Sequence, residues 1–132
     1  MRILVVHNFY RISGGEDSVF RNETELLRAG GNEVFTYTEN NGELSAVRLL
    51  FDAVFSKKTY RAVRELIKQQ NIEIVHVHNE RFLISPSVFT AALDSHVPVV
   101  QTLHNFRLLC INAMLSYRGA VCRECLKEGG VR

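Results

Sequence analysis

The sequence contains no apolar run that approaches the roughly 20 residues needed to cross a bilayer. Its first residues, M-R-I-L-V-V-H-N, become polar too early for a secretory signal peptide. An excess of one charge is also lacking, because the formal net charge of +2 is too small to indicate nucleic acid as a partner. No repeat, low-complexity tract or internal linker is present. We therefore expect a cytoplasmic globular protein that does not bind nucleic acid.

Cysteine is scarce, with three residues in the chain. An odd number leaves one thiol unpaired in any disulfide framework, and the cytoplasm favours reduced thiols. Cys122 and Cys125 have the spacing of a metal knuckle, and Cys110 lies upstream across a predicted hairpin at Arg118–Gly119. Inert thiols are favoured because a lone C-x-x-C is a weak signal. A structural zinc ion, with a fourth ligand such as His96, and a disulfide remain as alternatives.

The apolar content of the sequence suits a single domain. The chain has 132 residues, 46% of them hydrophobic, and a chain of this length buries roughly two-thirds of its unfolded surface. Short runs rich in β-branched residues predict buried parallel strands. These runs are residues 2–7, 33–38, 72–78 and 97–103. The run at 33–38 alternates more than the others, which predicts a strand near the edge of the sheet.

Three amphipathic stretches predict helices between these strands. The first ends at Gly30–Gly31, and the third begins at Ser85 as the N-cap with Pro86 at the first helical position. Their apolar stripes are Val19, Phe20, Leu26 and Leu27; Tyr60, Val63, Leu66 and Ile67; and Val88, Phe89, Ala92 and Leu93. The alternation of strands and helices predicts an α/β fold, a Rossmann-like three-layer sandwich with a mostly parallel sheet.

Three of the five histidines precede asparagine where a predicted strand ends, as His7–Asn8, His78–Asn79 and His104–Asn105. The carboxyl ends of parallel strands meet at one edge of an open sheet, so we expect these pairs to line one crevice. Their neutral donors and acceptors suit a polyhydroxylated or phosphorylated ligand. The alternative is that Asn accepts turn dihedrals and that both side chains satisfy loose backbone groups.

A glycine-containing loop, F-Y-R-I-S-G-G-E-D, follows the first predicted strand. Gly14 and Gly15 precede a helix N-terminus, where free N–H groups favour an anion or a close-packed sugar. The loop matches neither G-x-G-x-x-G nor the Walker pattern, which disfavours a dinucleotide or P-loop site. Glu16 and Asp17 either cap the helix or accept hydrogen bonds from hydroxyl groups. A simple tight turn is the alternative.

Taken together, four segments resemble a known family. The segments are M-R-I-L-V-V-H-N-F-Y with S-G-G-E, I-V-H-V-H-N with S-P-S-V, V-P-V-V-Q-T-L-H-N-F-R-L-L-C, and V-C-R-E-C-L. They are similar to the N-terminal part of family-4 glycosyltransferases of the GT-B fold. The resemblance runs over almost the whole chain. It implies two Rossmann-like domains that face each other across a cleft, the N-terminal one holding the acceptor and the C-terminal one the nucleotide-sugar. It also implies retention of anomeric configuration and requires no metal or cofactor.

The resemblance implies roles for individual residues. Gly14 and Gly15, with Glu16, match the glycine loop that approaches the donor phosphates or the acceptor. His104 matches the histidine that contacts the transferred sugar near the reacting carbon, and it is the candidate catalytic residue. The remaining candidates for substrate binding are His7, Asn8, His78, Asn79, Glu80 and Asn105.

The resembled fold extends beyond Arg132, with further acceptor-domain strands and a whole donor domain. We therefore expect residues 1–132 to be a single partial Rossmann-like domain, a truncated GT-B N-terminal domain without the C-terminal donor domain and inactive alone. Expected partners are a nucleotide-sugar, bound through the absent domain, and a glycan, lipid-linked or small-molecule acceptor. The alternative is a non-catalytic α/β module that binds a sugar or phosphate. A flavodoxin-like regulatory domain is disfavoured, because the first strand ends in His-Asn rather than clustered acids.

Two expectations concern larger partners. Residues 44–64 combine apolar and basic side chains, as segments on anionic lipid do, although helix-on-sheet packing is the favoured reading. We also expect a homodimer built from the edge of strand 97–103 and the segment 105–126. An open sheet edge recruits partners, and the apolar residues Ile111, Met114 and Leu115 of that segment need burial.

Overall fold

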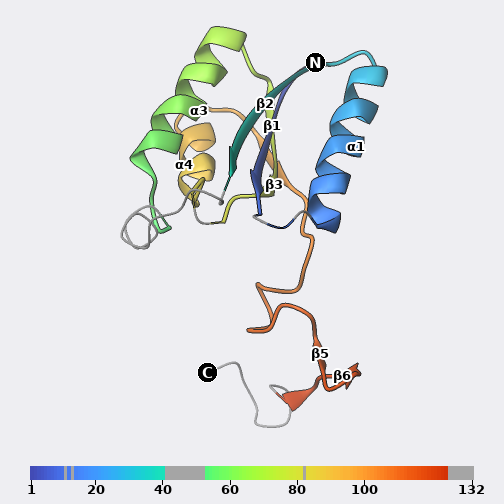
Figure 1. The fold of residues 1–132 in the computed structure, drawn as a ribbon. Helices are drawn as coiled ribbons and strands as arrows, with labels where there is room; N and C mark the ends of the chain where they lie inside the picture. Colours follow the sequence, from blue (N-terminus) through green and yellow to red (C-terminus); the bar gives the residue numbers. More distant parts are fainter. Residues whose placement is uncertain (11, 13, 41–52, 82, 125–132) are drawn as a thin grey trace. The chain divides into compact units, whose positions relative to one another are not determined.

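A computed structural model describes residues 1–10, 12, 14–40, 53–81 and 83–124, in two compact units, Met1–Thr102 and Leu103–Arg132. The first unit has three layers, a parallel sheet with α1 on one face and with α3 and α4 on the other (Figure 1). This arrangement confirms the predicted α/β class and the Rossmann-like three-layer sandwich.

The sheet of the first unit contains the four strands expected from the sequence. They are β1 (Arg2–Phe9), β2 (Glu33–Asn40), β3 (Ile74–Asn79) and β4 (Val99–Gln101). Their order is β2-β1-β3-β4 and all pairs are parallel. β2 lies at an edge, as its alternating pattern predicts, and β4 is shorter than predicted. β1 is central, and its residues from Ile3 to Asn8 are all buried.

Among the described residues, three helices cover this sheet, namely α1 (Gly15–Ala29), α3 (Lys57–Gln70) and α4 (Ser87–Leu93). Successive side chains of a strand point to opposite faces. Leu4 and Val6 of β1 therefore join the core under α3 and α4, while Ile3 and Val5 pack with Phe20 of α1. Burial on both faces explains why the strands read as nearly continuous apolar runs.

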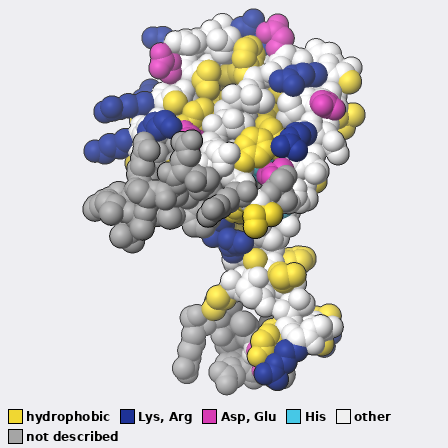
Figure 2. Space-filling model, in the orientation of Figure 1, with side chains coloured by type: hydrophobic (Ala, Val, Ile, Leu, Met, Phe, Trp, Pro, Cys, Tyr) yellow, Lys and Arg dark blue, Asp and Glu magenta, His cyan; other side chains and the backbone are white. Residues whose placement is uncertain are grey.

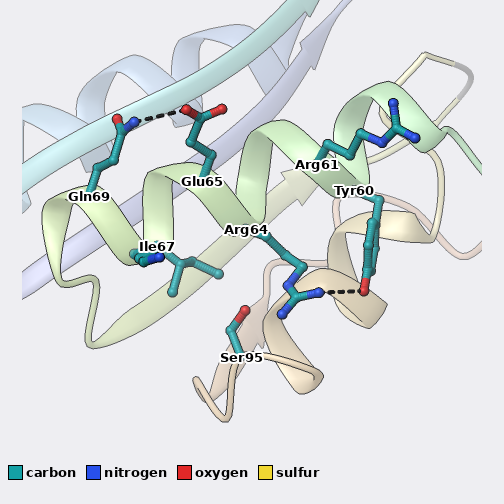
Figure 3. A pocket seen from close by; sticks show the side chains of 8 residues that line it. Tyr60, Arg61, Arg64, Glu65, Ile67, Gln69 and Ser95 are labelled. Atoms are coloured by element: carbon teal, nitrogen blue, oxygen red, sulfur yellow. Dashed lines mark hydrogen bonds between the residues drawn. The ribbon is translucent and has the colours of Figure 1, made fainter.

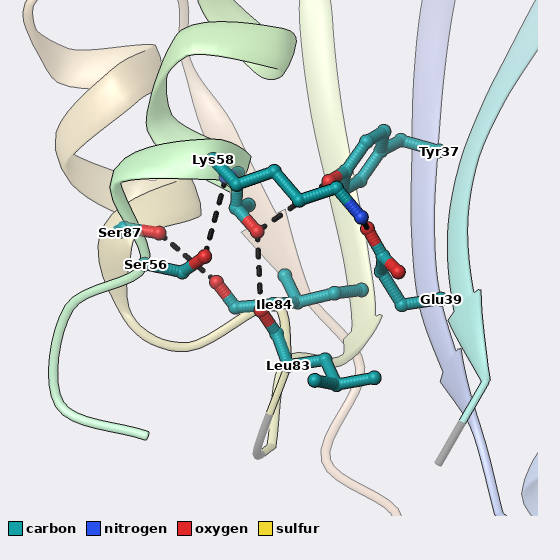
Figure 4. A network of polar contacts seen from close by, with 8 residues as sticks. Tyr37, Glu39, Ser56, Lys58, Leu83, Ile84 and Ser87 are labelled. Atoms are coloured by element: carbon teal, nitrogen blue, oxygen red, sulfur yellow. Dashed lines mark hydrogen bonds and ion pairs between the residues drawn. The ribbon is translucent and has the colours of Figure 1, made fainter. Parts of the chain in front are cut away.

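The beginnings of α3 and α4 are joined through serine side chains (Figure 4). The Oγ atom of Ser56 caps α3 by accepting the N–H of Thr59 at 3.3 Å. Helix α4 begins at Ser87, one residue later than predicted, with Pro86 in the N-cap position. Ser85 stands before it with a left-handed backbone (φ 59°), and its Oγ accepts the N–H of Ser56 at 2.8 Å and of Ser87 at 3.3 Å. The hydroxyl of Ser85 thus contacts both helix ends.

The edge strand β2 is connected to α3 by a polar network around Tyr37 (Figure 4). The Tyr37 hydroxyl donates to Oε1 of Glu39 at 3.0 Å and lies 3.4 Å from Oγ1 of Thr59. The Lys58 ammonium lies 2.5 Å from the same Glu39 oxygen. Burial, with the Glu39 charge as a smaller contribution, raises the pKa of Tyr37 to about 12, against the opposing hydrogen bond with Thr59. Burial and the neighbouring Glu39 carboxylate therefore stabilise the protonated phenol.

The second unit contains a short antiparallel hairpin of β5 (Ser116–Tyr117) and β6 (Ala120–Val121). Both turn residues have positive φ, 51° for Arg118 and 78° for Gly119, as a two-residue type I′ turn requires. The structure thus confirms the predicted hairpin. Several large apolar side chains of this unit are exposed, namely Leu103, Phe106, Leu108, Leu109, Ile111, Met114, Tyr117 and Val121.

The basic amphipathic stretch 44–64 lies only partly within the described residues, because 41–52 fall outside them. From Lys57 onward it forms α3, whose Val63 and Ile67 are buried in the core. Lys and Arg side chains gather over the outer surface of this helix (Figure 2). No helix in the described part of the chain combines the length and the apolarity that membrane crossing requires.

We predict that the exposed apolar side chains of the second unit cause self-association. Ile111 is 93% exposed and Leu109 71% exposed, and burial of such surface on association is favourable by roughly 25 cal/mol per Å². Replacing both by serine should shift the molecular mass measured by light scattering at micromolar concentration from a dimer or larger assembly toward a monomer. Val54→Ser, at an exposed position of the first unit, is the control. A wild-type monomer at every concentration would contradict the prediction.

We also predict a pH dependence of stability that originates at Tyr37. Its folded-state pKa of about 12 lies above the unfolded value of about 10. The contribution to the free energy of unfolding is therefore complete below pH 10 and is lost as the pH rises from 10 through 12. Urea unfolding between pH 9 and 12 should show this loss in wild type and not in Tyr37→Phe. Tyr117→Phe in the exposed hairpin is the control, and equal slopes for wild type and Tyr37→Phe would refute the assignment.

Candidate functional site

The carboxyl ends of β1 and β3 lie side by side in the sheet. Val6 pairs with Val77, but the next residue of β1, His7, pairs with Asn79. This shift leaves His78 as an extra residue in β3, a β-bulge of the kind that re-aims side chains near functional sites. Two of the three His-Asn pairs therefore end adjacent strands at one edge of the sheet.

The asparagines of these two pairs connect the strand ends through backbone groups. Nδ2 of Asn79 donates to the carbonyl of Asn8 at 2.9 Å, and Oδ1 of Asn79 accepts the N–H of Arg81 at 3.2 Å. Nδ2 of Asn8 donates in turn to the carbonyl of Arg81. These contacts correspond to the reading in which asparagine satisfies loose backbone groups where a strand turns into a loop.

The side chains at this edge are enclosed by protein. His7, Asn8, His78 and Asn79 are each at most 4% exposed, so they do not line an open crevice in this structure. Glu80 is half-buried, and its Oε2 accepts a hydrogen bond from Nε2 of Gln101 at 3.1 Å. A ligand at this edge would therefore contact the residues that surround these four side chains, and not the four side chains themselves.

A buried ion-pair geometry links the end of β1 to the start of α1. Nε2 of His7 lies 2.8 Å from Oδ1 of Asp17, and both side chains are almost fully buried. The other oxygen of Asp17 accepts the N–H of Gly14 at 3.3 Å, which caps the helix as the sequence analysis allowed. When the Asp17 carboxylate is ionised it only accepts hydrogen bonds, and Nε2 of His7 then carries the proton and donates. The ring of His7 also stacks on Phe20 with centroids 4.7 Å apart.

Gly14 and Gly15 stand in front of this capped helix start. Gly14 has an extended backbone (φ −126°, ψ −174°), and Gly15 is the first residue of α1. A Cβ atom built on either glycine would have no heavy atom within 4 Å among the described residues. Neither the backbone conformation nor the packing of the described residues therefore requires glycine at these two positions, and space is left beside the first N–H groups of α1.

A second group of titratable side chains lies further along the same face of α1. His76 and His78 are two residues apart on β3, so both point to the face that α1 covers. Nε2 of His78 lies 3.5 Å from Oε2 of Glu23, and Nε2 of His76 lies 3.9 Å from Oε1 of the same carboxylate. Oγ1 of Thr102 lies 2.8 Å from Nε2 of His76. Asp17, Phe20 and Glu23 follow one another at three-residue spacing, which places them on one stripe of α1.

His104 and Asn105 belong to the second unit. They line a mostly apolar hollow formed by residues of that unit, with Leu103, Phe106, Leu108 and Leu109. That His104 and Asn105 share a crevice with the other two His-Asn pairs remains a prediction. Oδ1 of Asn105 accepts the N–H of Arg107 at 3.1 Å, which is again a local backbone contact.

Of the three cysteines, Cys110 and Cys122 are free thiols in the described chain, and Cys125 lies outside the described residues. The Cys110 thiol donates to Oδ1 of Asn112 at 2.8 Å. Hydrogen bonding from the backbone N–H of Leu115, with smaller contributions from neighbouring amides, lowers the pKa of Cys110. The zinc alternative stays a prediction.

An open groove runs along the outer side of α3 (Figure 3). Its basic residues are Arg61, Arg64 and Lys68, and Nη1 of Arg64 donates to the Tyr60 hydroxyl at 3.0 Å. The Tyr60 hydroxyl donates to Asp94 at 2.6 Å, so one of the cations is already part of a surface network. None of the candidate residues from the sequence lies in this groove.

Three features of this edge were not predicted from the sequence, namely the positions of His76 and Glu23 and the pairing of Asp17 with His7. The alternation V-H-V-H in a predicted buried strand was a usable signal for His76 and His78, because period two places both on one face. No local signal indicates Glu23, since its approach to β3 depends on how α1 packs on the sheet. No protein-family model matches the chain, and no curated protein matches it significantly.

We predict that Asp17→Ala destabilises the first unit strongly. The substitution leaves His7 buried without its carboxylate and removes the helix cap, and losing one partner of a buried pair costs about 3 kcal/mol or more. Urea unfolding should show this loss in the free energy of unfolding. Glu16→Ala, in the same helical turn and only half-buried, is the control and should cost less than about 1 kcal/mol. Equal, small effects would show that the pair contributes little.

Proposed function

We propose that the chain is the acceptor-side, Rossmann-like part of a retaining glycosyltransferase that transfers a sugar from a nucleotide-sugar to a glycan, lipid-linked or small-molecule acceptor. The motifs that resemble family-4 glycosyltransferases motivate the proposal. The observation that carries it is the loop of Gly14 and Gly15, two glycines that the described fold does not require.

Gly15 has an energetic cost within the described fold, whereas Gly14 occupies the N-cap of α1, where glycine is among the favoured residues. Glycine in a helix is less favourable than alanine by roughly 0.8–1.0 kcal/mol in the interior, with a smaller difference at the first position. Gly15 is helical, and Gly14 has a conformation open to any residue. Since no described atom lies within 4 Å of a Cβ at either position, packing gives no reason for glycine. Space for a ligand against the backbone is a sufficient reason.

The chemistry at this loop suits a sugar or a phosphate. The first N–H groups of α1 and the helix dipole favour negative charge. The half-buried Glu16 supplies a carboxylate that accepts hydrogen bonds from hydroxyl groups. Sugar transfer passes through an oxocarbenium-like state and needs positioned partners for hydroxyls and for the leaving phosphate. The buried pair of Asp17 and His7 holds the loop in place for this role.

The other residues take the roles that the resemblance implies. His104, with Asn105 beside it, is proposed to contact the transferred sugar, and Glu80 to face the acceptor. The nucleotide-sugar is proposed to bind mainly to a donor domain, so the chain of 132 residues alone should bind ligand weakly and show no turnover. A non-catalytic module that binds a sugar or phosphate would use the same loop without transfer.

We predict that Gly15→Leu weakens ligand binding without loss of stability. The leucine fills the space beside the helix start, while helix propensity improves by up to about 1 kcal/mol. Ligand-detected NMR with UDP-, GDP- and ADP-hexoses and with oligosaccharides should show binding to wild type and at least a tenfold lower affinity for the variant, as expected for about 1.4 kcal/mol. Asn22→Leu, at an exposed position of the same helix, is the control.

The outcomes separate the two candidate functions. Nucleotide release from a nucleotide-sugar by the full coding product, and not by residues 1–132 alone, supports the transferase. Binding with no transfer by either protein supports the non-catalytic module. Failure of wild type to bind any of these ligands, or equal affinities of wild type and Gly15→Leu, contradicts both.

A further inference from the structure

The pattern V-H-V-H in β3 creates a pair of neighbouring imidazoles, whose ring planes are tilted by 36°. His76 and His78 point to one face of the sheet, and their ring centroids lie 4.4 Å apart. β3 is hydrogen-bonded to β1 on one side and to β4 on the other. The two side chains therefore project from a strand held on both edges, and rigid elements hold ligating groups more precisely than loops do.

Helix α1 brings a carboxylate to this pair. Glu23 lies one helical turn beyond Phe20, which packs on the same sheet face. One oxygen of Glu23 is 3.5 Å from Nε2 of His78, and the other is 3.9 Å from Nε2 of His76. Ligand atoms from the three residues all lie within 4.8 Å of one another. Two imidazoles and one carboxylate thus converge from a strand and a helix.

We infer that Glu23, His76 and His78 form a binding site for a divalent transition-metal ion, with Zn²⁺ as the best match. The inference does not depend on the proposed function. Direct hydrogen bonds between nitrogen and oxygen are typically 2.7–3.2 Å long, so separations of 3.5 and 3.9 Å are too long for good ones. Around a tetrahedral ion with bonds of about 2.0–2.2 Å, ligand atoms are roughly 3.3–3.5 Å apart. The 3.5 Å separation between Glu23 and His78 matches this spacing, whereas the 3.9 Å separation and the 4.8 Å limit of the cluster are longer, so a shared ion would draw His76 inward.

The donor set selects the class of metal. Neutral imidazole nitrogen suits Zn²⁺ and its neighbours in the first transition row, whereas Mg²⁺ and Ca²⁺ prefer sites built from oxygen. One carboxylate leaves the site with a net charge of +1 when a divalent ion binds. Three protein ligands leave one tetrahedral position for water, which distinguishes such a site from a closed structural one.

An entry path is present, and one existing contact would be exchanged for the ion. The Glu23 side chain is 34% exposed, whereas those of His76 and His78 are 11% and 0% exposed. An ion can therefore reach the site from the side of Glu23 and bind against the two buried imidazoles. Oγ1 of Thr102 lies 2.8 Å from Nε2 of His76, and a cation at that nitrogen would replace this contact.

Titration with Co²⁺, followed by visible absorption and by competition with Zn²⁺, tests the site. Wild type should bind one ion per chain, with the visible bands of a tetrahedral site and without thiolate charge-transfer bands. Glu23→Gln and His76→Gln should each lower the affinity at least tenfold, because a ligand is lost. Glu25→Gln, at an exposed position of the same helix, is the matched control and should bind like wild type.

The cysteines are the competing source of zinc ligands. A variant with all three cysteines replaced by serine should retain the ion and its affinity. Circular dichroism of each variant without metal checks that the fold is intact, and the conservative Glu23→Gln change at a partly exposed position should preserve it. The inference would be overturned if wild type bound no ion. It would also be overturned if wild type showed thiolate bands that disappear when the cysteines are replaced, or if Glu23→Gln and His76→Gln both left the affinity unchanged.

Discussion

The pairing of β1 with a neighbour on each side is the constraint on which the first unit depends. β1 is hydrogen-bonded to β2 along one edge and to β3 along the other, and helices cover both of its faces. Its residues from Ile3 to Asn8 are consequently buried without a break. Water does not reach the polar end of such a strand, so partners for its side chains must come from the protein.

That requirement explains the arrangement at the carboxyl edge. His7 faces α1 and finds Asp17, which also caps the helix. Asn8 points to the opposite face and donates a hydrogen bond to the carbonyl of Arg81, while Asn79 donates one to the carbonyl of Asn8. The same contacts that satisfy buried groups also position the glycine loop at the first turn of α1. Stability and a potential binding surface therefore share their supporting residues at this edge.

One face of helix α1 presents both apolar and acidic side chains to the sheet. Phe20 supplies the apolar contact that seats the helix on the sheet, and Asp17 and Glu23 lie one turn before and one turn after it. Each acid meets histidine from a strand beneath, Asp17 at 2.8 Å and Glu23 at 3.5 Å and 3.9 Å. The shorter separation makes a hydrogen bond, and the longer ones leave room for an ion. One packing arrangement thus produces a structural pair and a candidate metal site.

The order and type of the elements follow from the sequence alone, since β-branched runs such as 2–7 and stripes such as Tyr60, Val63 and Ile67 encode them locally, as does the turn at Arg118–Gly119. The location of His7, Asn8, His78 and Asn79 at strand ends follows equally. Only the tertiary structure decided that Asp17 pairs with His7, and that Glu23 meets His76 and His78. Those contacts join residues distant in the chain, and they depend on how α1 packs and on the register shift that inserts His78. Local propensity carries no information about either.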